Sequence, residues 1–550
     1  MTIVGVGDRA LAVLVAAETA EAATARVRGI AAAVDAATIA GVVDVVPSPD
    51  RVTVVYDPLR IASVATIREA VAAAAAATNE TPVARPGVCH EISVCYGGDR
   101  GPDLEEVCLT HGLSRPTLVA LHTEPEYLVQ AIGFLPGFGY LAGLDPRLVT
   151  PRRGTPRLRV PAGSVGIGGP QTGVYPFASP GGWNILGMSP ARLFDAARVR
   201  PSLLEVGDRV RFVEITPDEL LEPRGGEAQP PRQSADVPGR SLTVLKPGLF
   251  TTIQDLGRPG YRASGVPLSG AADAVSLRLA NLLVGNREDA AALEVTLLGP
   301  DIRFEAAAVV AVTGGEFPGL PSGRPLLVSA GDVVRMGHAV RGCRGYLAIN
   351  GGIRVDRVLG SASTFTAARF GGMNGQPLAA GDRVPLGPSD VVDATALVGH
   401  ASPVADGLVR PARLRMIPGE QSADYGEAIW SMTHRTSSRS DRMGVRLEGE
   451  PLGGGLEGAG SMRSVAVLPG TVQVPPDGQP IVLLADAQTI GGYPVIGHVI
   501  AADLPVAAQL RPGDLVCWRQ ATIEEAHQAL RDREAAASVR FGLTRPGERR

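Results

Sequence analysis

The sequence predicts a mainly β protein in which two related β-barrel units follow a small N-terminal α+β module. The main observation is a heptapeptide written twice, GGWNILG at 181–187 and GGYPVIG at 491–497. Each copy follows a similar lead-in, VPAGSV at 160–165 and LPGTV at 468–472. The second observation is that short apolar runs are cut by glycine and proline, which is typical of barrels and sandwiches. Because two related units that face each other create a cleft, we expect a small-molecule site between them.

The first 85 residues predict the α+β module. Short apolar runs predict strands over 10–15, 42–46 and 52–56, and the last two flank the turn sequence Pro-Ser-Pro-Asp. Apolar residues at helical spacing predict helices over 18–36 and 61–77. The predicted buried faces are Ala23, Val27, Ile30 and Val34 in the first helix, and Val64, Ile67 and Val71 in the second. Strands and helices in this order suggest a ferredoxin-like arrangement.

The remaining residues divide into two β regions. Residues 86–222 predict the first barrel, and the polar, proline-rich stretch 223–240 predicts a linker. Residues 241–520 predict the second β region, and 521–550 a helix with a charged tail. Gly-Asp pairs open apolar strands in both regions, at 207–208, 331–332, 381–382 and 513–514. Within the second region a helix is expected over 271–284, with Val275, Leu279 and Leu282 on its buried face and Gly285 ending it.

The composition argues against nucleic acid and membrane partners. The formal net charge is −4, so no strongly basic surface is indicated. Apolar runs are far shorter than the roughly 20 residues that cross a bilayer, and no secretory signal is recognisable at the start. The five cysteines form no Cys-x-x-Cys pair, which favours reduced thiols over disulfides or a zinc site. We therefore expect a cytoplasmic protein.

The single lysine, Lys246, restricts the cofactor chemistry of the chain. A Walker A loop requires Gly-Lys-Ser/Thr, whereas Lys246 is followed by Pro247. A biotin-carrier domain would need a lysine in an Ala-Met-Lys-Met-like turn, so we expect no covalently bound biotin in this chain. If a nucleotide binds, backbone amides and arginines must hold its phosphates.

Glycine-rich turns of the first barrel carry candidate ligand-binding groups. The segment 133–140 holds three aromatic residues in a chain that is only 4% aromatic, and 166–176 offers backbone amides that could form an anion nest. The plainer alternative is that both are structural turns. The candidate binding residues are Phe138, Tyr140, Arg159, Gly163, Ser164, Gln171, Thr172 and Tyr175. His122 is a candidate catalytic residue, although a lone histidine is more often structural.

In the second half, arginines alternate with carboxylates and amides on predicted turns. An arginine fork can hold a carboxylate or phosphate, whereas a surface Arg–Asp pair would contribute little. The candidate binding residues are Gln254, Asp255, Arg258, Arg439, Arg442, Gln473, Gln479, Gln488 and Tyr493. Asp441, Asp477 and Asp486 are the candidate acid/base or magnesium-binding groups. We expect the cleft to lie between the turns 163–176 and 473–478.

These segments resemble a known family. Residues 8–225, with GFLPGFGYLAGLDPRL and SPGGWNILG, resemble allophanate hydrolase subunit 1, also called the sporulation-kinase-inhibitor-like protein. Residues 242–520, with TTIQDLGRPGY, SDRMG and ADAQTIGGYPVIG, resemble allophanate hydrolase subunit 2. Together they are similar to the carboxyltransferase half of urea carboxylase and to the B and C subunits of bacterial 5-oxoprolinase. The resemblance implies cyclophilin-like β-barrels in both halves.

The resemblance implies three alternative functions. The first is ATP-dependent hydrolysis of the lactam 5-oxo-L-proline to glutamate, with Mg²⁺ and an amidohydrolase-like A subunit as partner. The second is a carboxyltransferase that acts with biotin proteins, and the third is a regulatory module of a histidine kinase. The missing carrier lysine favours the first. Arg258, Arg439 and Arg442 are then the candidate clamps for the substrate carboxylate, and alanine at Asp477 or Arg442 should abolish cleavage while the fold stays intact.

One departure from the family pattern concerns the substrate. The second-subunit pattern has Gly-Gly-x-x-Gly-Arg where this chain has Gly-Gly-Met-Asn-Gly-Gln at 371–376, and an aromatic residue at the position of Val445. The arginine is thus replaced by Gln376, which leaves the substrate open between 5-oxoproline, urea and another amide. A homo-oligomer is also possible.

Overall fold

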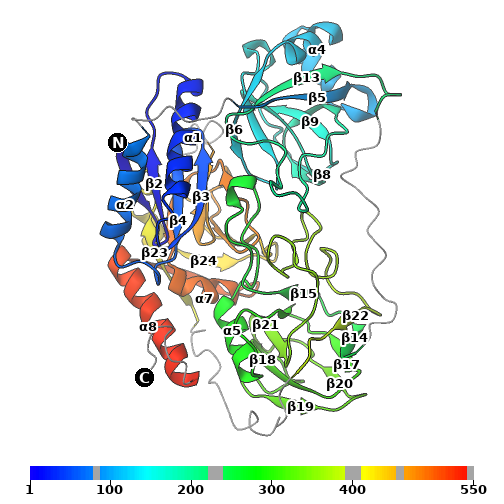
Figure 1. Ribbon diagram of the computed structural model, residues 1–550, viewed down its shortest axis with the longest axis vertical. Helices are drawn as coiled ribbons and strands as arrows, with labels where there is room; N and C mark the ends of the chain where they lie inside the picture. The colour runs from blue at the N-terminus through cyan, green and yellow to red at the C-terminus, as the bar shows by residue number, and fades with distance from the viewer. Residues whose placement is uncertain (79–86, 221–238, 390–409, 454–463, 542–550) are drawn as a thin grey trace.

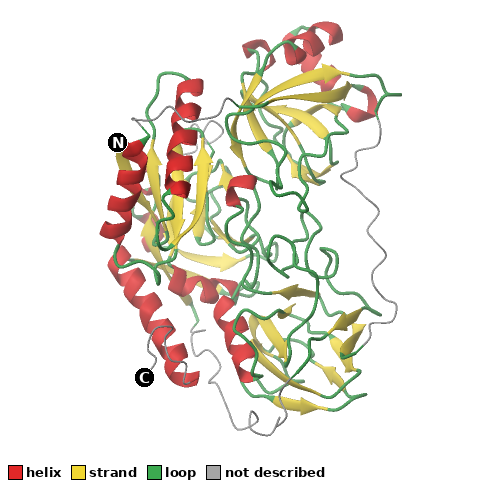
Figure 2. Cartoon of the chain, viewed as in Figure 1, coloured by secondary structure: helices red, strands yellow, loops and turns green. Residues whose placement is uncertain are grey.

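The computed structural model describes residues 1–78, 87–220, 239–389, 410–453 and 464–541. These residues form four packed units (Figure 1). We call them the N-module (1–78), barrel 1 (87–220), the sandwich (239–389) and barrel 2 with its helices (410–453 and 464–541). Strands dominate, and the helices lie partly at the outside of the molecule and partly between the units (Figure 2). The predicted mainly β fold with two barrels and an N-terminal α+β module is therefore confirmed. Nearly all of the predicted linker, 223–240, and the end of the tail lie outside the described residues.

The N-module is a four-stranded antiparallel sheet, ordered β1-β2-β4-β3, with two helices on it. Helix α1 begins after Thr19, whose side chain accepts from the backbone of Ala22, and it buries the predicted apolar face. Strand β1 occupies the sheet edge beside β2. The elements are β1 (Thr2–Val6), β2 (Ala10–Leu14), α1 (Ala20–Ala36), β3 (Val42–Ser48), β4 (Arg51–Tyr56) and α2 (Val64–Ala77).

Barrel 1 closes seven strands in the order β10-β7-β6-β13-β5-β12-β9, with β13 and β5 parallel. A separate two-stranded ribbon, β8 with β11, lies beside it. The strands are β5 (Cys89–Tyr96), β6 (Tyr127–Ile132), β7 (Gly139–Ala142), β8 (Arg157–Val160), β9 (Ser164–Gly168), β10 (Gln171–Val174), β11 (Ser179–Gly181), β12 (Asn184–Met188) and β13 (Arg209–Glu214). Helices α3 (Leu104–His111) and α4 (Arg115–Thr123) connect β5 to β6.

Barrel 2 repeats this topology strand for strand. Its cyclic order is β28-β25-β24-β31-β23-β30-β27, again with one parallel pair, β31 with β23. Its ribbon, β26 with β29, matches β8 with β11. The strands are β23 (Ala412–Pro418), β24 (Thr433–Thr436), β25 (Gly444–Glu448), β26 (Val465–Ala466), β27 (Thr471–Gln473), β28 (Ile481–Leu483), β29 (Ile490–Gly491), β30 (Val495–Val499) and β31 (Leu515–Gln520). Helices α7 (Leu504–Ala508) and α8 (Ile523–Phe541) flank β31. The duplicated heptapeptide thus spans β11–β12 in one barrel and β29–β30 in the other.

The four Gly-Asp pairs open strands by one shared turn. In each, the glycine has a φ near +90°, which favours glycine, and the aspartate accepts from the backbone N–H three residues earlier. The acceptors are Asp208, Asp332, Asp382 and Asp514, at 2.7–2.9 Å from the donors. The strands that follow are β13 and β31 of the barrels, and β20 (Val333–Arg335) and β22 (Arg383–Pro385) of the sandwich. The predicted strand openings are confirmed.

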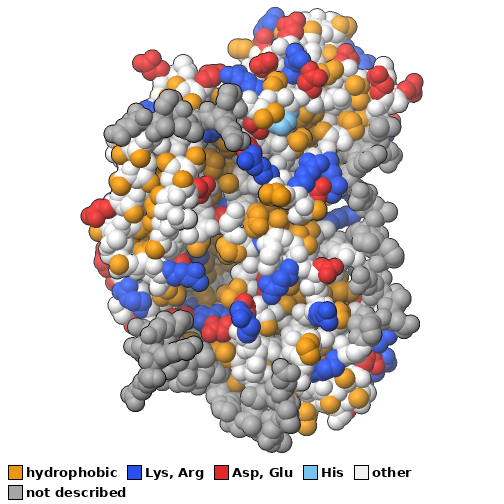
Figure 3. Space-filling view, in the orientation of Figure 1, with side chains coloured by type: hydrophobic (Ala, Val, Ile, Leu, Met, Phe, Trp, Pro, Cys, Tyr) orange, Lys and Arg blue, Asp and Glu red, His pale blue; other side chains and the backbone are white. Residues whose placement is uncertain are grey.

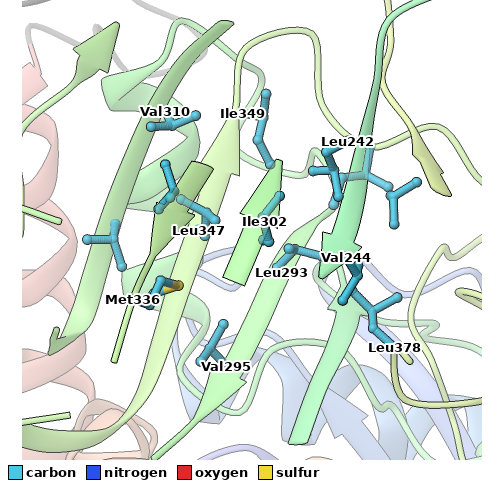
Figure 4. Packing of buried hydrophobic residues seen from close by; sticks show 14 of the residues in the cluster. Leu242, Val244, Leu293, Val295, Ile302, Val310, Met336, Leu347, Ile349 and Leu378 are labelled. Atoms are coloured by element: carbon cyan, nitrogen blue, oxygen red, sulfur yellow. The ribbon is translucent and has the colours of Figure 1, made fainter. Parts of the chain in front are cut away.

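The sandwich packs two sheets around one core (Figure 4). One sheet has the order β20-β17-β14-β22 and contributes Leu242, Val244 and Ile302, and the other, β15-β16-β21-β18-β19, contributes Leu293 and Leu347. The strands are β14 (Ser241–Lys246), β15 (Phe250–Gln254), β16 (Ala292–Thr296), β17 (Asp301–Phe304), β18 (Ala308–Glu316), β19 (Leu326–Val328), β20 (Val333–Arg335), β21 (Arg341–Ile349) and β22 (Arg383–Pro385). Of the second β region, the closed barrel therefore comprises only 412–520.

Helix α5 (Ala274–Leu283) is present as predicted, but its predicted buried face is wrong. Val275, Leu279 and Leu282 are half-buried, while the opposite side, including Leu277 and Ala280, is buried. The helix starts three residues later than predicted because the Asp273 side chain caps it through the Ser276 backbone N–H. Two polar residues, Ser276 and Asn281, lie on the buried side because their side chains bond Asp273 and the carbonyl of Ala290.

The N-module packs on barrel 2, which lies far along the chain, and it also contacts barrel 1 through β3 and β6 (Figure 1). Asp8 accepts from the backbone N–H of Ala501 at 2.8 Å, and its carbonyl bonds the ring of His527 at 2.7 Å. Arg51 pairs with Glu420 at 2.7 Å. A small apolar cluster of Ala10, Val55 and Leu468 completes this contact. The N-module in the first half of the chain is therefore in direct contact with barrel 2 in the second half.

The surface carries mixed charges and no recognisable membrane segment. On the face shown in Figure 3, acidic side chains gather over the upper end, and basic side chains are spread across the middle, where the units meet. Among the described residues, every helix is too short or too polar to span a bilayer.

Candidate functional site

The loop that follows β15, residues 255–270, lies where all four units meet. Ser264 accepts from the Gly137 backbone N–H of barrel 1 at 2.9 Å, and the Ser269 backbone N–H donates to Ala485 of barrel 2 at 2.9 Å. The Arg262 backbone N–H donates to the Asp44 carboxylate of the N-module at 3.1 Å. This loop begins within the TTIQDLGRPGY motif, at Asp255, and ends with the sequence GVPLSG at 265–270, so this motif of the second half does lie at the junction.

The glycine-aromatic corner of barrel 1 lies in a buried apolar cluster that extends to barrel 2. On the barrel 1 side, Trp183 packs edge-on against Phe138 with ring centroids 5.4 Å apart, and Tyr175 packs on the same Phe138. On the barrel 2 side, Ala466 and Ile490 join the same cluster. A Cβ placed on Gly133 of barrel 1 would lie 2.3 Å from the Ile490 side chain, so the barrels approach closely. The two barrels therefore meet here through apolar contact, whereas Tyr493 of the second heptapeptide is exposed and lies outside this cluster.

A buried ion network connects the sandwich to barrel 2. The Arg442 guanidinium binds both carboxylate oxygens of Asp486, at 2.8 and 3.0 Å, and also bonds Glu294 and the carbonyl of Gly270. Ser269 donates to Asp486 at 2.8 Å. Burial opposes the charge of Arg442, but Asp486 and Glu294 outweigh it and raise its pKa. Two predicted site residues, Arg442 and Asp486, therefore bind each other. The hydrogen bonds of the Arg442 guanidinium go to other residues of the protein.

Asp255 and Arg258 lie in the same loop but do not form an ion pair. The Asp255 carboxylate is held by the hydroxyl groups of Ser361 and Ser363 and by the backbone N–H of Ala362 at 2.7 Å. Arg258 is 1% exposed, and its guanidinium lies over the ring of Phe370, 4.9 Å from the centroid. Burial lowers its pKa to about 10. Among the described residues, Arg258 Nη1 has no hydrogen-bond partner.

Amide side chains surround the same junction. Gln254 is fully buried, and its Nε2 donates to Thr252 and to the carbonyl of Thr364, which leaves Oε1 without a partner among the described residues. On barrel 2, Gln488 Nε2 donates to Gln473 at 3.3 Å. The hydroxyl of the neighbouring Thr489 likewise lacks a partner among the residues that the structure describes. Buried polar atoms without partners are uncommon, and Gln254, Arg258 and Thr489 each leave one here, although others are distributed over the rest of the described residues. Together with the meeting of the units, these atoms mark the junction as the candidate site.

His122 and Thr172 lie away from this junction, inside barrel 1. His122 is fully buried, with Nδ1 bonded to Tyr96 at 2.7 Å and Nε2 to Thr172 at 2.8 Å, and its ring stacks on Phe212. Burial lowers the pKa of His122 to about 3. These contacts are those of a structural histidine, because both ring nitrogens are bonded within the core.

Protonation of His122 should make stability depend on pH. Its pKa lies near 6.5 in the unfolded chain and near 3 in the folded one, so only the unfolded state gains a proton as pH falls below 6.5. Stability should therefore fall by about 1.4 kcal/mol per pH unit in this range. We expect H122Q to lose roughly 2 kcal/mol less than wild type between pH 7 and 5, measured by denaturant unfolding. Substitution of the exposed His338 is the control, and equal pH slopes for wild type and H122Q would contradict the assignment.

The other predicted site residues are dispersed. The exposed ones are Arg159, Arg439, Asp441, Asp477 and Tyr493. Asp441 accepts from the Met443 backbone N–H, and Asp477 from that of Gln479, so both aspartates stabilise turns. Gln479 bonds the backbone of Gly449 within barrel 2. Buried or half-buried in barrel 1 are Tyr140, Gly163, Ser164 and Gln171.

The three candidate aspartates do not form a metal site. Across the described ranges, no group of three or more His, Cys, Asp or Glu side chains is arranged to hold a metal ion. Asp486 is bonded to Arg442 and Ser269, while Asp441 and Asp477 cap separate turns. These residues therefore do not fit a protein-held Mg²⁺ ion.

Sequence reasoning missed the sandwich residues that complete the junction. Glu294 lies within the apolar strand β16, where a single acidic residue between Leu293 and Val295 was the available signal. Phe370 follows a residue with positive φ, Arg369, and immediately precedes the segment of the family departure. Arg262 directly follows the TTIQDLGRPGY motif, and Ser269 lies seven residues further along the same loop.

Comparisons with known proteins assign a family to both halves. The family model "Carboxyltransferase domain, subdomain C and D" matches residues 1–204, and "Carboxyltransferase domain, subdomain A and B" matches 264–520. The chain is similar to the 5-oxoprolinase C subunit of Escherichia coli K12, with 38% identity over 305 residues, covering 53% of this chain and 95% of the relative. It is 59% identical over 123 residues to the 5-oxoprolinase B subunit of E. coli O157:H7, covering 22% of this chain and 56% of that relative.

Two further similarities extend the comparison. Urea amidolyase of Lachancea kluyveri is 33% identical over 337 residues, covering 55% of this chain and 18% of the relative. The crystal structure of TTHA0988 is 37% identical with a TM-score of 0.80, covering 93% of this chain and 99% of that one. The protein therefore belongs to the carboxyltransferase-domain family that includes the 5-oxoprolinase B and C subunits and the urea amidolyases.

Proposed function

We propose that this chain is the combined B-type and C-type component of an ATP-dependent 5-oxoprolinase, which hydrolyses 5-oxo-L-proline to L-glutamate with a separate amidohydrolase-like subunit. The supporting observation is that one chain carries a part similar to the B subunits and a part similar to the C subunits of 5-oxoprolinases. The interlocking of the two halves supports a joint role, because the N-module of the first half packs on the barrel of the second.

Hydrolysis of 5-oxoproline requires activation of the lactam, and the junction of the four units can help to provide it. A lactam is resonance-stabilised, so water attacks it readily only after its oxygen has gained electrophilic character. Transfer of the γ-phosphoryl group of ATP to that oxygen would supply this, with ADP leaving. Water would then add to the carbon, and the ring C–N bond would break while the nitrogen takes a proton, which leaves an acyl phosphate. A second water would hydrolyse this acyl phosphate to the carboxylate of glutamate and free phosphate. Buried donors such as Arg258 stabilise developing negative charge strongly because they are shielded from water.

The biotin-dependent alternative would need a carrier from another chain. Lys246, the single lysine, is exposed at the end of β14, pairs with Asp301 at 3.4 Å and is followed by Pro247. We expect no biotin label on this chain after expression with a biotin ligase, as tested by a streptavidin blot. The variant K246R should keep full activity, and a labelled chain whose activity is lost in K246R would contradict the proposal.

The function is tested by reconstitution. The purified chain is mixed with the amidohydrolase-like subunit, ATP, Mg²⁺ and 5-oxo-L-proline, and glutamate is measured against reactions that lack each protein. Glutamate production that requires both proteins and ATP is the expected result. Absence of glutamate, together with carboxylation of urea when a biotinylated carrier and its carboxylase are added, would show that the chain is a carboxyltransferase component instead.

A further inference from the structure

Three arginines were candidates for holding an anionic group of the substrate, and the structure distinguishes them. Arg442 directs its guanidinium to Asp486, Glu294 and Gly270. Arg439 is exposed, with Glu448 3.7 Å away. Arg258 is the largest fully buried side chain of the described residues. Of these three arginines, Arg258 is the one whose buried guanidinium leaves a nitrogen, Nη1, without a partner in the described part of the chain. Arg262, Arg344 and Arg383, which were not candidate clamps, each leave Nε without a partner there.

The acidic side chains near Arg258 form their hydrogen bonds with groups other than Arg258. The nearby charged groups are Asp255, Asp486 and Arg442. The Asp255 oxygens accept from serine hydroxyls and backbone N–H groups, and those of Asp486 accept from Arg442 and Ser269. The other guanidinium nitrogens of Arg258 donate to backbone carbonyls, Nη2 to Ser363 and Nε to Val358. A buried cation without its own counter-ion is costly, so an anion that binds Nη1 would be stabilised there.

A second polar atom without a partner lies on the same segment. Gln254 Nε2 donates to the carbonyl of Thr364, which can only accept, so Oε1 is the atom left without a partner among the described residues. Arg258 donates to the carbonyl of the adjacent residue, Ser363. The two side chains are thus anchored on consecutive peptide units, one with a spare donor and one with a spare acceptor. A ligand with an oxyanion and an N–H group would match both.

We propose that Arg258 binds an oxyanion through Nη1, and that Gln254 Oε1 accepts from an N–H group when the ligand has one. A planar carboxylate or a phosphoryl group presents the oxygens that a guanidinium binds. A cyclic amide with a carboxylate uses both residues, whereas phosphate uses Arg258 alone. The identification of the oxyanion as the carboxylate of a lactam rests on the proposed function. The oxyanion site at Arg258 does not depend on that function. Phe370 covers the guanidinium and stacks on Phe194 of barrel 1, so this site lies at the contact between barrel 1 and the sandwich.

The test uses binding to the purified full-length chain, without the partner subunit. Titration calorimetry is performed with 5-oxo-L-proline, with 2-pyrrolidinone, which is the same lactam without a carboxylate, and with inorganic phosphate. We expect R258M to weaken 5-oxoproline binding by about 10- to 100-fold, the range for a lost hydrogen bond to a charged group, and to leave 2-pyrrolidinone binding unchanged. The matched control, R324M at an exposed arginine, should bind all three as wild type does.

Each outcome decides the proposal. If phosphate binds wild type but not R258M, while 5-oxoproline does not bind, the oxyanion site stands and the lactam assignment falls. The proposal is overturned if R258M binds 5-oxoproline and phosphate as wild type does, or if the substitution weakens the binding of both lactams equally. It is also overturned if wild type binds neither 5-oxoproline nor phosphate. Should R258M fail to fold, hydrogen exchange of wild type decides. In that case 5-oxoproline or phosphate must slow exchange in 254–258 and 358–372, and unchanged exchange there overturns the site. Failure of glutamate production with intact anion binding would contradict only the proposed function.

Discussion

Replacing Arg442 by methionine should destabilise the protein by about 3–5 kcal/mol, the cost of removing one partner from a buried ion pair. The change leaves the carboxylates of Asp486 and Glu294 buried without their principal counter-ion. The network joins the sandwich to barrel 2, so loss of Arg442 should also loosen the contact between them. The measurement is denaturant unfolding followed by circular dichroism. The expectation that alanine at Arg442 would remove activity with the fold intact is therefore not supported by these contacts.

The control for this prediction lies three residues away. R439M removes an exposed arginine and should change stability by no more than about 0.5 kcal/mol. The triple variant R442M/E294Q/D486N removes the uncompensated charges and should recover part of the loss, because buried pairs as a whole contribute little. If R442M unfolded at the same denaturant midpoint as wild type, the Arg442 guanidinium would not be the main stabilising group of the contact between the sandwich and barrel 2.

Replacing Trp183 by alanine should destabilise the protein by about 3–5 kcal/mol, as large aromatic truncations in a core do. Trp183 is 5% exposed and packs against Phe138, Tyr140 and Tyr175 in the cluster that joins the barrels. The cavity left behind would also remove support for Ile490 of barrel 2. We expect lower unfolding midpoints and exchange of nearby amides, measured by hydrogen exchange, to increase on both sides of the barrel contact.

The internal repeat provides the matched control. Tyr493 occupies the position of Trp183 in the second heptapeptide, but it is 36% exposed. Y493A should therefore cost less than about 1 kcal/mol, as surface truncations usually do. Similar losses for W183A and Y493A would mean that the two corners contribute equally, against the asymmetry seen in their burial.

Local features of the fold could be predicted because local sequence determines them. The α1 face at Val27 and Ile30 follows from helical spacing, and the Gly-Asp strand openings follow from one turn that needs a glycine with positive φ. The equivalence of the two barrels followed from the repeated heptapeptide. Helix α5 shows the limit, because its buried side holds Ser276 and Asn281, whose burial depends on partners that the periodicity does not reveal.

For the candidate site, the motifs could be predicted from the sequence, but the contacts between their residues could not. Arg258, Gln254 and Asp486 were selected from their sequence context, and they do lie at the junction of the units. Their partners were not predictable, because the bonds of Arg442 to Glu294 and of Ser269 to Asp486 join residues 148 and 217 positions apart. Asp441 and Asp477 were selected by residue type alone, and the structure places both on exposed turns of barrel 2.

The packing of the N-module on barrel 2 has a consequence during synthesis. The backbone near Pro469, which the Arg9 side chain contacts, is made 460 residues later than Arg9. At translation rates of 5–20 residues per second, the docking face of the N-module waits on the order of 20–90 s before its counterpart leaves the ribosome. Throughout that interval Ala10 and Val55 lack Leu468 as a cover. The nascent chain thus presents an uncovered sheet face that a holding chaperone would bind, and release would coincide with the synthesis and folding of barrel 2.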